Sequence, residues 1–477
     1  MGRRSLVPPD GGWGWVIVVA FALFNFLVIP VLQNFGLIFQ GKFKELGMSA
    51  TDETFVVTSG LAIGMLAGFF YGPLIKKFNY RKVCTVSAFL TSVGIISMMY
   101  AEKMVHFLMS YGLLTSIGLS LGMTSYSYAL NSYFLKRRSF ATGFAYTITC
   151  MGSIAMPQLI SFLLSQYDVS GTCLIIGGLS LNCFVSAALL QPVEWHMKED
   201  LSNFHRSTAG NTKRSSIYTI NLQEGHCSEI NTDEMNRKAV SDSTTAIFSD
   251  RNLVVAEEKD SAIKEFFYTI AHIFDLSLLK DMSFLNLLMG LSAAAFAEQA
   301  FSVLTPFILA DLHMNTQQIA TFISVLSLTD LIFRFITPFI GNYFKVTSKM
   351  MCMVSFCLLT LSRSCLFLPL HQYEFFVGVA LAIGVAKGVR TVYWTLVLPD
   401  YVPLKMLPSA TGMHMVLNGL FLFIGGPILG VAKHLSGSYV NCVLITNGIT
   451  LVALTTWSCE IGYTKYINSK KEEITKM

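Results

Sequence analysis

Six ionisable residues lie inside long apolar stretches in the second half of the sequence: Glu298, Asp330, Arg334, Arg363, Lys387 and Arg390. Asp330 and Arg334 are four residues apart, and Lys387 and Arg390 are three apart, so each pair shares one face of a helix. An arginine grips a carboxylate through two parallel hydrogen bonds, whereas a lysine offers a point charge. These residue types predict acid–base pairing together with binding of an anion.

The placement of these residues depends on the helices that carry them. Apolar residues make up 53% of the 477 residues and charged residues 13%, whereas soluble domains are about a quarter charged. Twelve apolar stretches are long enough to cross a hydrocarbon core of about 30 Å as helices. We therefore expect an all-α membrane protein with twelve transmembrane helices in a lipid bilayer. The stretches are at about 13–39, 54–75, 83–101, 106–130, 139–165, 171–192, 284–310, 318–343, 350–370, 374–398, 409–432 and 439–459.

The sequence predicts three parts. The apolar signal stops after Pro192, and residues 199–260 are rich in polar side chains. We expect an N-terminal six-helix bundle over 1–192, a cytoplasmic linker over 193–281, and a C-terminal six-helix bundle with a cytoplasmic tail over 282–477. The end of the linker, 262–279, is apolar at helical spacing and is expected to lie along the membrane surface.

The two bundles resemble each other. "YFLKRRSFATGF" follows the fourth apolar stretch, and "YVPLKMLPSATGM" follows the tenth. A six-helix unit repeated in the same orientation is typical of the major facilitator fold, in which the substrate site lies between the halves near the midplane.

Basic residues are distributed unequally between the connections. Twelve lysines and arginines fall in the short segments on the side of the N-terminus, and four fall in the opposite loops. Because cytoplasmic loops of membrane proteins collect lysine and arginine, both termini and the linker are predicted to be cytoplasmic. We expect a multi-pass protein of the plasma membrane.

No sequence pattern indicates catalysis or a bound metal. The ten cysteines are scattered without a C-x-x-C pair, which argues against a disulfide framework or a zinc site. The sequence has no H-E-x-x-H motif and no phosphate-binding P-loop, so zinc-dependent hydrolysis and primary ATP-driven pumping are excluded. We expect no enzymatic activity, no cofactor and no nucleic-acid partner.

Charges inside a membrane are costly, at least about 2.5–3.5 kcal/mol each. Six of them imply a polar interior cavity and mutual pairing. If Asp330 pairs with Arg334, and Glu298 with one further cation, two positive charges remain. Such a cavity attracts a small carboxylate, which improves the charge balance as it binds. The alternative is that these residues only join helices through buried salt bridges.

Three stretches resemble the monocarboxylate transporter family of the major facilitator superfamily: "PDGGWGWVIVVAF" (9–21), "YFLKRRSFATGFA" (133–145) and "SLTDLIFRFITPFIG" (327–341). The resemblance covers both halves. It implies alternating-access transport of small organic acids, in several members together with a proton, and makes a single-pass immunoglobulin-like chaperone an expected partner. By motif, Asp330 and Arg334 fall on the family's coupled acid and its carboxylate-binding arginine.

Two signatures of the family lie at the starts of the first and fifth apolar stretches. The resemblance gives a structural and gating role to their residues, and the physical alternative for the tryptophans is an aromatic belt at the membrane interface. The signature residues are Asp10, Trp13, Trp15, Tyr133, Lys136 and Arg137.

The sequence departs from the proton-coupled members at one position. Those members carry a lysine in the first span where this sequence has Gln33. A glutamine cannot take up a proton and then present a cation to the substrate, so coupling by that route is in doubt. The residues predicted to bind the substrate are Gln33, Asn34, Arg334, Lys387, Arg390 and His414, and those predicted to carry a proton, where one is carried, are Asp330 and Glu298.

Other functions remain open at this point. Branches of the family without that lysine move larger or differently charged solutes, so an amino acid or a carnitine-like zwitterion, moved without proton coupling, is an alternative substrate. A nutrient sensor on the same fold would bind a solute without flux. An ion channel is disfavoured, because pore-lining charge should recur in both halves or through oligomer symmetry.

Overall fold

The computed structural model describes residues 6–47, 50–199, 274–368, 372–436 and 439–476. Its internal contacts divide the chain into one unit of Met1–Val7 with Lys198–Ser277 and a second of Pro8–Met197 with Leu278–Met477. In the first unit, the two-residue strands β1 (Leu6–Val7) and β2 (Lys198–Glu199) pair antiparallel. Residues 262–273 of the expected surface segment lie outside the described residues, and the segment's end overlaps the short helix η5 (Leu276–Lys280).

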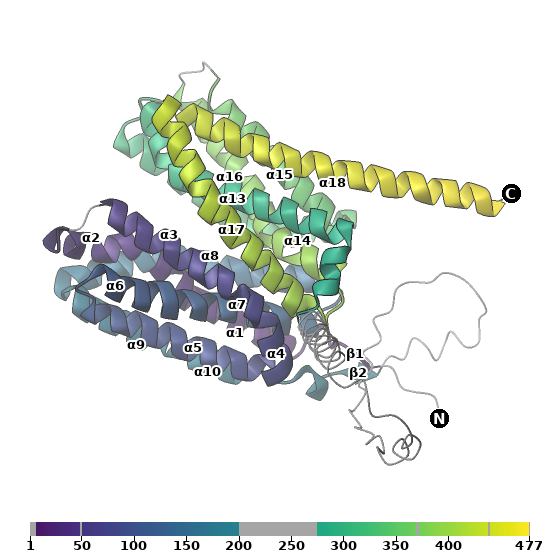
Figure 1. Cartoon of the computed structure of the whole chain (residues 1–477), viewed down its shortest axis with the longest axis horizontal. Coiled ribbons are helices and arrows are strands. Elements are labelled where there is room, and N and C mark those ends of the chain that lie inside the picture. The colour runs from purple at the N-terminus through teal and green to yellow at the C-terminus, as the bar shows by residue number, and fades with distance from the viewer. Residues whose placement is uncertain (1–5, 48–49, 200–273, 369–371, 437–438, 477) are drawn as a thin grey trace, which may run out of the picture. The chain divides into compact units, whose positions relative to one another are not determined.

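The second unit is helical, and its two halves are coloured purple to blue and green to yellow in Figure 1. The first half contains α1 (Gly14–Gln33), α2 (Phe35–Glu45), α3 (Ala50–Leu66), η1 (Ala67–Phe70), α4 (Tyr71–Phe78), α5 (Tyr80–Ser97), η2 (Met98–Tyr100), α6 (Met104–Phe107), η3 (Leu108–Thr115), α7 (Ser116–Tyr133), α8 (Arg138–Gln166), α9 (Val169–Ser180), α10 (Asn182–Leu189) and η4 (Val193–Trp195). The second half contains α13 (Met282–Asp311), α14 (Thr316–Phe344), α15 (Ser348–Cys365), α16 (Tyr373–Tyr401), α17 (Leu407–Ser436) and α18 (Tyr439–Lys476).

Within the described residues, 11 helical segments are long and apolar enough to cross a membrane. They are Gly14–Gln33, Val56–Phe78, Tyr80–Tyr100, Met104–Tyr133, Arg138–Gln166, Val169–Leu189, Met282–Asp311, Gln317–Phe344, Tyr373–Tyr401, Leu407–Lys433 and Tyr439–Ile467. The remaining predicted span corresponds to α15, whose 18 residues include Lys349 and Arg363. Because α15 is short, these two charges and its serines weigh more on its mean hydropathy than the charges of the longer spans do. With α15, the described residues contain the twelve helices that the sequence predicts.

The first predicted span, 13–39, is divided into two helices. Asn34 leaves helical geometry (φ −102°, ψ 20°), and its side-chain amide donates a 2.7 Å hydrogen bond to the carbonyl oxygen of Pro30. An asparagine side chain that bonds to nearby backbone competes with the helix. Because the residues on both sides of Asn34 are equally apolar, hydropathy does not mark this break.

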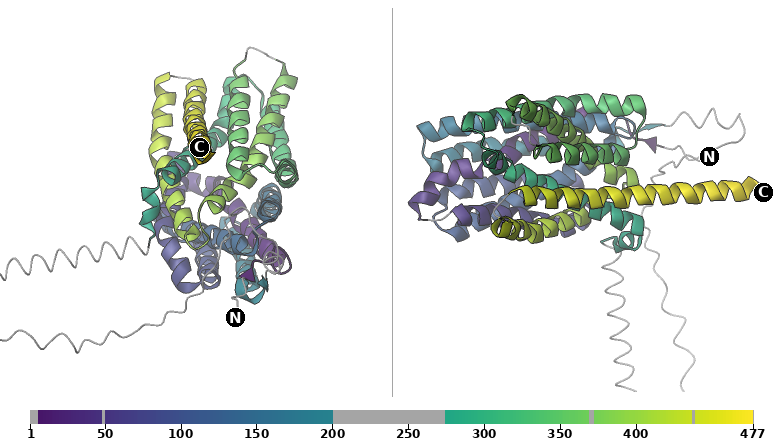
Figure 2. Two further views of the ribbon diagram at one scale, coloured as in Figure 1. Left: turned by 90° about the vertical axis from the view of Figure 1, so that its right-hand side faces the viewer. Right: turned by 90° about the horizontal axis from the view of Figure 1, so that it is seen from above.

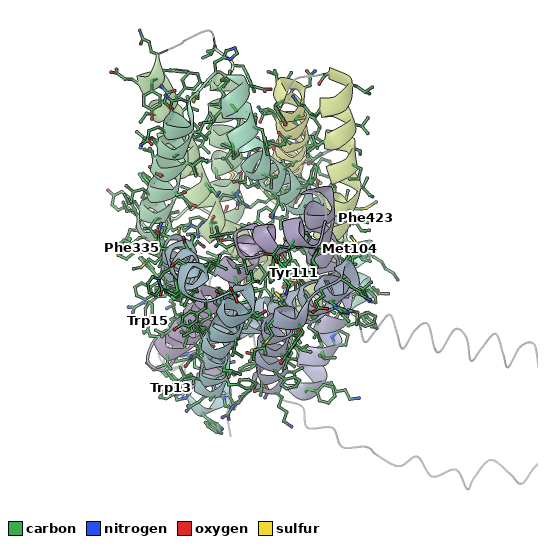
Figure 3. All side chains as sticks on the ribbon, turned by 90° about the vertical axis from the view of Figure 1, so that its left-hand side faces the viewer. Trp13, Trp15, Met104, Tyr111, Phe335 and Phe423 are labelled. Atoms are coloured by element: carbon green, nitrogen blue, oxygen red, sulfur yellow. The ribbon has the colours of Figure 1, made fainter. Side chains whose placement is uncertain are left out.

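Large apolar side chains lie exposed along the outer faces of the second unit. Phe335 and Phe423, labelled in Figure 3, are 49% and 65% exposed. The hydrocarbon of a bilayer covers such side chains in a membrane protein, so this exposure is expected for lipid-facing positions.

Asp281 forms the N-cap of α13. Its carboxylate accepts hydrogen bonds from the hydroxyl of Tyr401 at 2.7 Å and from the backbone N–H of Ser283 at 2.9 Å. These bonds, chiefly that from Tyr401, hold the pKa of the Asp281 carboxyl below its usual value. The start of α13 is thereby joined to the end of α16.

The two halves lie side by side in the second unit (Figure 2), and two sets of helices form their contact. α17 packs against α3, η1 and α4, while α14 packs against α8. Small residues permit this approach: a Cβ on Gly412 would lie 2.3 Å from the Gly68 oxygen, and one on Gly143 would lie 2.5 Å from Pro338 Cγ. Both contacts lie near the same end of the helices, where the connections 134–137 and 402–406 are found. We call this the terminal end, and the halves are in close contact there.

Candidate anion-binding site

Asp330 and Arg334 form a two-pronged ion pair within α14. Nε and Nη2 of Arg334 donate hydrogen bonds to the two carboxylate oxygens of Asp330, each 2.7 Å long. Nη1 of Arg334 lies 3.4 Å from the Tyr146 carbonyl oxygen on α8, in the other half. Asp330 is 4% exposed, so the pair is buried and neutral, as the four-residue spacing predicts.

Glu298 of α13 lies among three cations. Nη2 of Arg363 on α15 donates a hydrogen bond to Glu298 Oε2. On the other side, Nζ of Lys387 and Nη2 of Arg390, both on α16, lie 3.8 and 4.0 Å from Oε1. One carboxylate balances only one of these cations. The cluster therefore carries the surplus of two positive charges that the sequence predicts.

A cavity of about 440 Å³ lies between the two halves. Arg390, His414 and Asn418 line it from the second half. The first half contributes serine, leucine and methionine side chains together with Tyr146, and none of these lining residues is ionised at neutral pH. All the charge around the cavity therefore comes from one wall.

Arg390 belongs to an aromatic cluster on that wall. Its guanidinium lies 5.4 Å from the ring of Trp394, and the Trp394 ring lies 5.4 Å from that of His414. Nε of Arg390 and Nε2 of His414 are buried and have no hydrogen-bond partner among the described residues. Buried polar groups normally have partners, so each of these two nitrogens lacks a hydrogen bond that a neighbouring group would ordinarily supply.

The other predicted substrate residues lie differently. Neither Gln33 nor Asn34 lines this cavity in the described part of the chain. Gln33 is exposed at the end of α1, and the amide of Asn34 is engaged by its own helix. Arg334 and Lys387 are also absent from the described lining of this cavity. Nζ of Lys387 lies 3.8 Å from Glu298, and its side chain is 25% exposed.

The two family signatures contact each other. Oδ1 of Asp10 accepts hydrogen bonds from the backbone N–H groups of Leu135, Lys136 and Arg137 at 2.7, 2.9 and 3.3 Å. The N–H of Asp10 in turn donates to the carbonyl oxygen of Tyr133 at 3.1 Å. One carboxylate thus fixes the connection that precedes α8, the helix that reaches Arg334.

The two signature tryptophans, labelled in Figure 3, have different surroundings. The Trp13 indole donates a 3.2 Å hydrogen bond to the Leu189 carbonyl and stacks on His196 at 5.6 Å. Trp15 is 37% exposed and meets Phe134 edge-on. The position of Trp15 fits an interfacial belt, whereas Trp13 joins the start of α1 to the end of α10.

We expect Asp10→Ala to lower the stability of the protein by about 1–2 kcal/mol, the usual effect of losing a side chain that caps backbone N–H groups. Asp10 has φ 48°, a conformation that asparagine also tolerates, so Asp10→Asn keeps an acceptor and serves as the matched control. Thermal unfolding of the purified protein in detergent measures the effect. An alanine variant that unfolds at the same temperature as the wild type would show that these hydrogen bonds do not stabilise the protein.

One residue that sequence reasoning missed connects the halves. Nη1 of Arg138 donates to the carbonyl oxygen of Pro399 at 3.2 Å and lies 3.9 Å from Oδ1 of Asp400. The run of Lys136, Arg137 and Arg138 marks a basic connection in the sequence, but it does not reveal which of the three side chains turns toward the other half. Arg138 joins α8 to the end of α16 at the terminal end.

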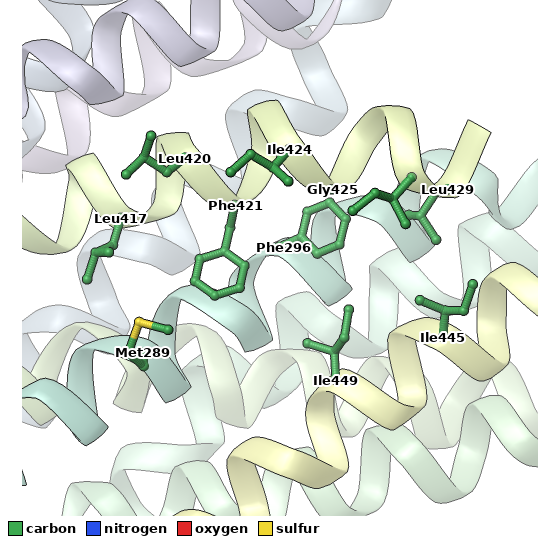
Figure 4. A pocket seen from close by; sticks show the side chains of 11 residues that line it. Met289, Phe296, Leu417, Leu420, Phe421, Ile424, Gly425, Leu429, Ile445 and Ile449 are labelled. Atoms are coloured by element: carbon green, nitrogen blue, oxygen red, sulfur yellow. The ribbon is translucent and has the colours of Figure 1, made fainter. Parts of the chain in front are cut away.

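A second hollow, of about 260 Å³, lies between α13, α17 and α18 (Figure 4). Apolar side chains such as Met289, Phe296, Phe421 and Ile449 surround it, and none of its lining residues is charged. A carboxylate placed there would lose its hydration without a partner. Of these two hollows, only the cavity beside Arg390 has a cation in its described lining.

Comparison with known proteins identifies the fold family. Residues 14–426 match the family model of the Major Facilitator Superfamily. The solved structure of FucP, a transporter of that superfamily in the outward conformation, superposes with a TM-score of 0.57 over 93% of this chain and 98% of that one, at 13% identity. The chain belongs to the Major Facilitator Superfamily, and the predicted fold of two six-helix bundles is confirmed.

Proteins of similar sequence indicate which members of the superfamily this chain resembles. Monocarboxylate transporter 13 of Bos taurus is 32% identical over 186 residues, which are 39% of this chain but only 44% of that protein. Monocarboxylate transporter 1 of Bos taurus is 25% identical over 94% of this chain and 86% of its own length. Monocarboxylate transporter 12-B of Danio rerio is 24% identical over 100% of this chain and 93% of its own length. The resemblance to monocarboxylate transporters predicted from the sequence is confirmed.

Proposed function

We propose that this multi-pass membrane protein transports small monocarboxylates by alternating access of the cavity between its halves. The surplus of two positive charges beside a cavity lined by Arg390 is the observation that carries the proposal. A carboxylate entering the cavity reaches Arg390, one of three cations that share the single carboxylate of Glu298, and charge-assisted hydrogen bonds to arginine are strong. A zwitterion would bring a cation into the same positive field, so the arrangement favours an anion over an amino acid or a carnitine-like solute.

We propose that Arg334, Lys387, Arg390 and His414 form the substrate site. Arg334 has five N–H donors, and its bonds to Asp330 and Tyr146 leave some of them for a ligand. Proton coupling through Asp330 or Glu298 stays a prediction. Both carboxylates already contact cations.

We propose that the terminal end is cytoplasmic and that the protein acts in the plasma membrane. We also propose that residues 1–192 and 282–477 form its two transport bundles, and that 193–281 form the linker between them. The excess of lysine and arginine on that side supports this orientation. Close contact of the halves at the terminal end then corresponds to a state closed toward the cytoplasm. An immunoglobulin-like single-pass chaperone is a further proposed partner, which co-purification from cells would reveal.

Uptake of radiolabelled organic acids tests the proposed function. The purified protein is placed in liposomes, and uptake of short and aromatic monocarboxylates is measured with and without an inward proton gradient. We expect uptake above protein-free liposomes for at least one acid. Binding without flux would instead indicate a sensor, and flux of neutral zwitterions alone would favour the alternative substrate class.

We expect Lys387→Met to raise the apparent KM for anionic substrates about tenfold with a smaller change in kcat. The variant removes one of the two surplus charges, and loss of one charge contact of about 1.4 kcal/mol corresponds to that factor. Initial rates of uptake over a range of substrate concentrations measure it. Kinetics equal to those of the wild type would show that Lys387 does not contribute to substrate binding.

A further inference from the structure

We propose that the protein has a second ligand site, a hollow at the terminal end that binds a phosphate monoester group and joins the two halves through it. The hollow has a volume of about 310 Å³, and its described lining shares no residue with the cavity beside Arg390. The first half contributes the start of α8 and the connection before it. The second half contributes the end of α14, the start of α15 and part of α16.

The charges in this hollow match a doubly charged anion. In the described part of the chain, three cations and one carboxylate line it: Lys136 and Arg138 from the first half, and Lys345 and Asp400 from the second. Asp400 is already engaged, since it accepts a hydrogen bond from the hydroxyl of Ser348 and lies 3.9 Å from Nη1 of Arg138. A phosphate monoester carries about −1.5 to −2 charges at neutral pH and has three acceptor oxygens. It therefore balances the lining better than a carboxylate would.

The hollow also contains a buried polar group without a partner. Tyr393 is only 3% exposed, and its hydroxyl makes no hydrogen bond within the described residues. Gly341 lies directly against this hydroxyl, because a Cβ there would overlap the Tyr393 oxygen, and both residues line the hollow. Buried hydroxyls normally have a hydrogen-bond partner. An oxygen of a bound phosphate would supply it.

The N-terminus of α15 adds to the positive field of the hollow. Thr347, the N-cap of this 18-residue helix, makes no side-chain capping hydrogen bond, and the next residue, Ser348, lines the hollow. The first backbone N–H groups of a helix have no partner within it, and together with the helix dipole they favour a nearby anion. The cations, the hydroxyl and the helix end thus favour the same kind of ligand.

A phosphate bound in this hollow would contact both halves at once, through Lys136 and Arg138 on one side and Lys345 on the other. These contacts exist only while the halves are close together at the terminal end. A ligand that binds one state better than another shifts the protein toward that state, so the phosphate stabilises the closed terminal end. A transporter that opens its two ends in turn is slowed by such a ligand. The binding is independent of the proposed function, whereas this effect on transport rests on it.

Thermal unfolding of the purified full-length protein in detergent tests the binding. Glucose 6-phosphate is compared with glucose at matched ionic strength, and micelles that contain phosphatidylinositol 4-phosphate are compared with micelles that contain phosphatidylinositol. We expect at least one phosphate monoester to raise the unfolding temperature above that of its control. A rise with both would identify the phosphate group itself as the ligand, and a rise with one alone would identify its source as soluble or lipid. No rise with either would overturn the inference.

Two variants connect the rise to this hollow. Lys345→Gln removes one cation and Tyr393→Phe removes only the hydroxyl, so each should weaken binding about tenfold, the factor for one lost contact to a charged group. Titration of the unfolding temperature with the ligand measures the change. Lys405→Gln and Tyr343→Phe are the matched controls, because both residues are exposed and neither lines the hollow. Unchanged affinity in both hollow variants would mean that the ligand binds elsewhere, which would overturn the inference.

Uptake into liposomes tests whether the ligand joins the halves. The phosphate monoester that binds is present on both sides of the membrane, and uptake of radiolabelled organic acids is measured. We expect it to lower the initial rate in the wild type and to lower it less in Lys345→Gln. Binding without any change in rate would show that the ligand does not hold the terminal end closed. Absence of uptake in every arm would overturn the proposed function, while the unfolding measurements would still decide whether the site exists.

Discussion

Replacing Arg334 with glutamine is expected to reduce uptake at least about 100-fold, the factor that corresponds to about 2.7 kcal/mol. Arg334 contacts both halves, since it bonds to Asp330 in its own helix and approaches the Tyr146 carbonyl of α8. A glutamine can replace neither the charge nor the two-pronged geometry. Uptake normalised to protein at the cell surface, measured by biotinylation, gives the result.

The variant also leaves Asp330 buried without its partner, and removing one member of a buried pair costs about 3–5 kcal/mol of stability. The double variant Asp330→Asn with Arg334→Gln separates the two effects, because neither residue is then charged. We expect it to restore surface expression without restoring uptake. Recovery of uptake in the double variant would show that the pair only joins structural elements and does not bind substrate.

Replacing Glu298 with glutamine should destabilise the protein by a similar amount, about 3–5 kcal/mol. Arg363, Lys387 and Arg390 would then lie together without a carboxylate, and Arg363, at 1% exposed, has no access to water. The apparent melting temperature in detergent measures the change. The compensating double variant, Glu298→Gln with Arg363→Met, removes one buried cation and should recover part of the loss.

Glu460→Gln is the matched control for this experiment. Glu460 also pairs with a lysine, Lys349, at 2.9 Å, but its side chain is 21% exposed, and ion pairs that water reaches contribute little. We expect a change below about 1 kcal/mol. Equal melting temperatures for Glu298→Gln and the wild type would mean that the three cations do not depend on Glu298.

Spacing within one helix made part of the site predictable. Asp330 and Arg334 are one turn apart, so their pairing follows from helical geometry alone. The surplus of two positive charges follows from counting buried groups, whichever partner Glu298 takes. His414 and Asn418 are also one turn apart and both line the cavity, but spacing predicts only that they share a helix face, not that this face meets a cavity.

Contacts between helices were not predictable in this way. Glu298 and Arg363 are on α13 and α15, and no pattern in a single sequence sets the rotation of one helix against another. The same holds for Arg138, whose partners on α16 are 261 residues away in sequence. The break at Asn34 escaped prediction because apolar residues continue on both sides of it, so hydropathy does not mark the change of helix.

The central claim is that the cavity beside Arg390 recognises a carboxylate by its charge. Competition for uptake into liposomes between an unlabelled carboxylic acid and its uncharged amide, two molecules of nearly equal shape, tests it most directly. The account predicts that the acid blocks uptake of the labelled acid while the amide does not, and that Arg390→Gln abolishes the difference. Equal competition by the amide would contradict the account.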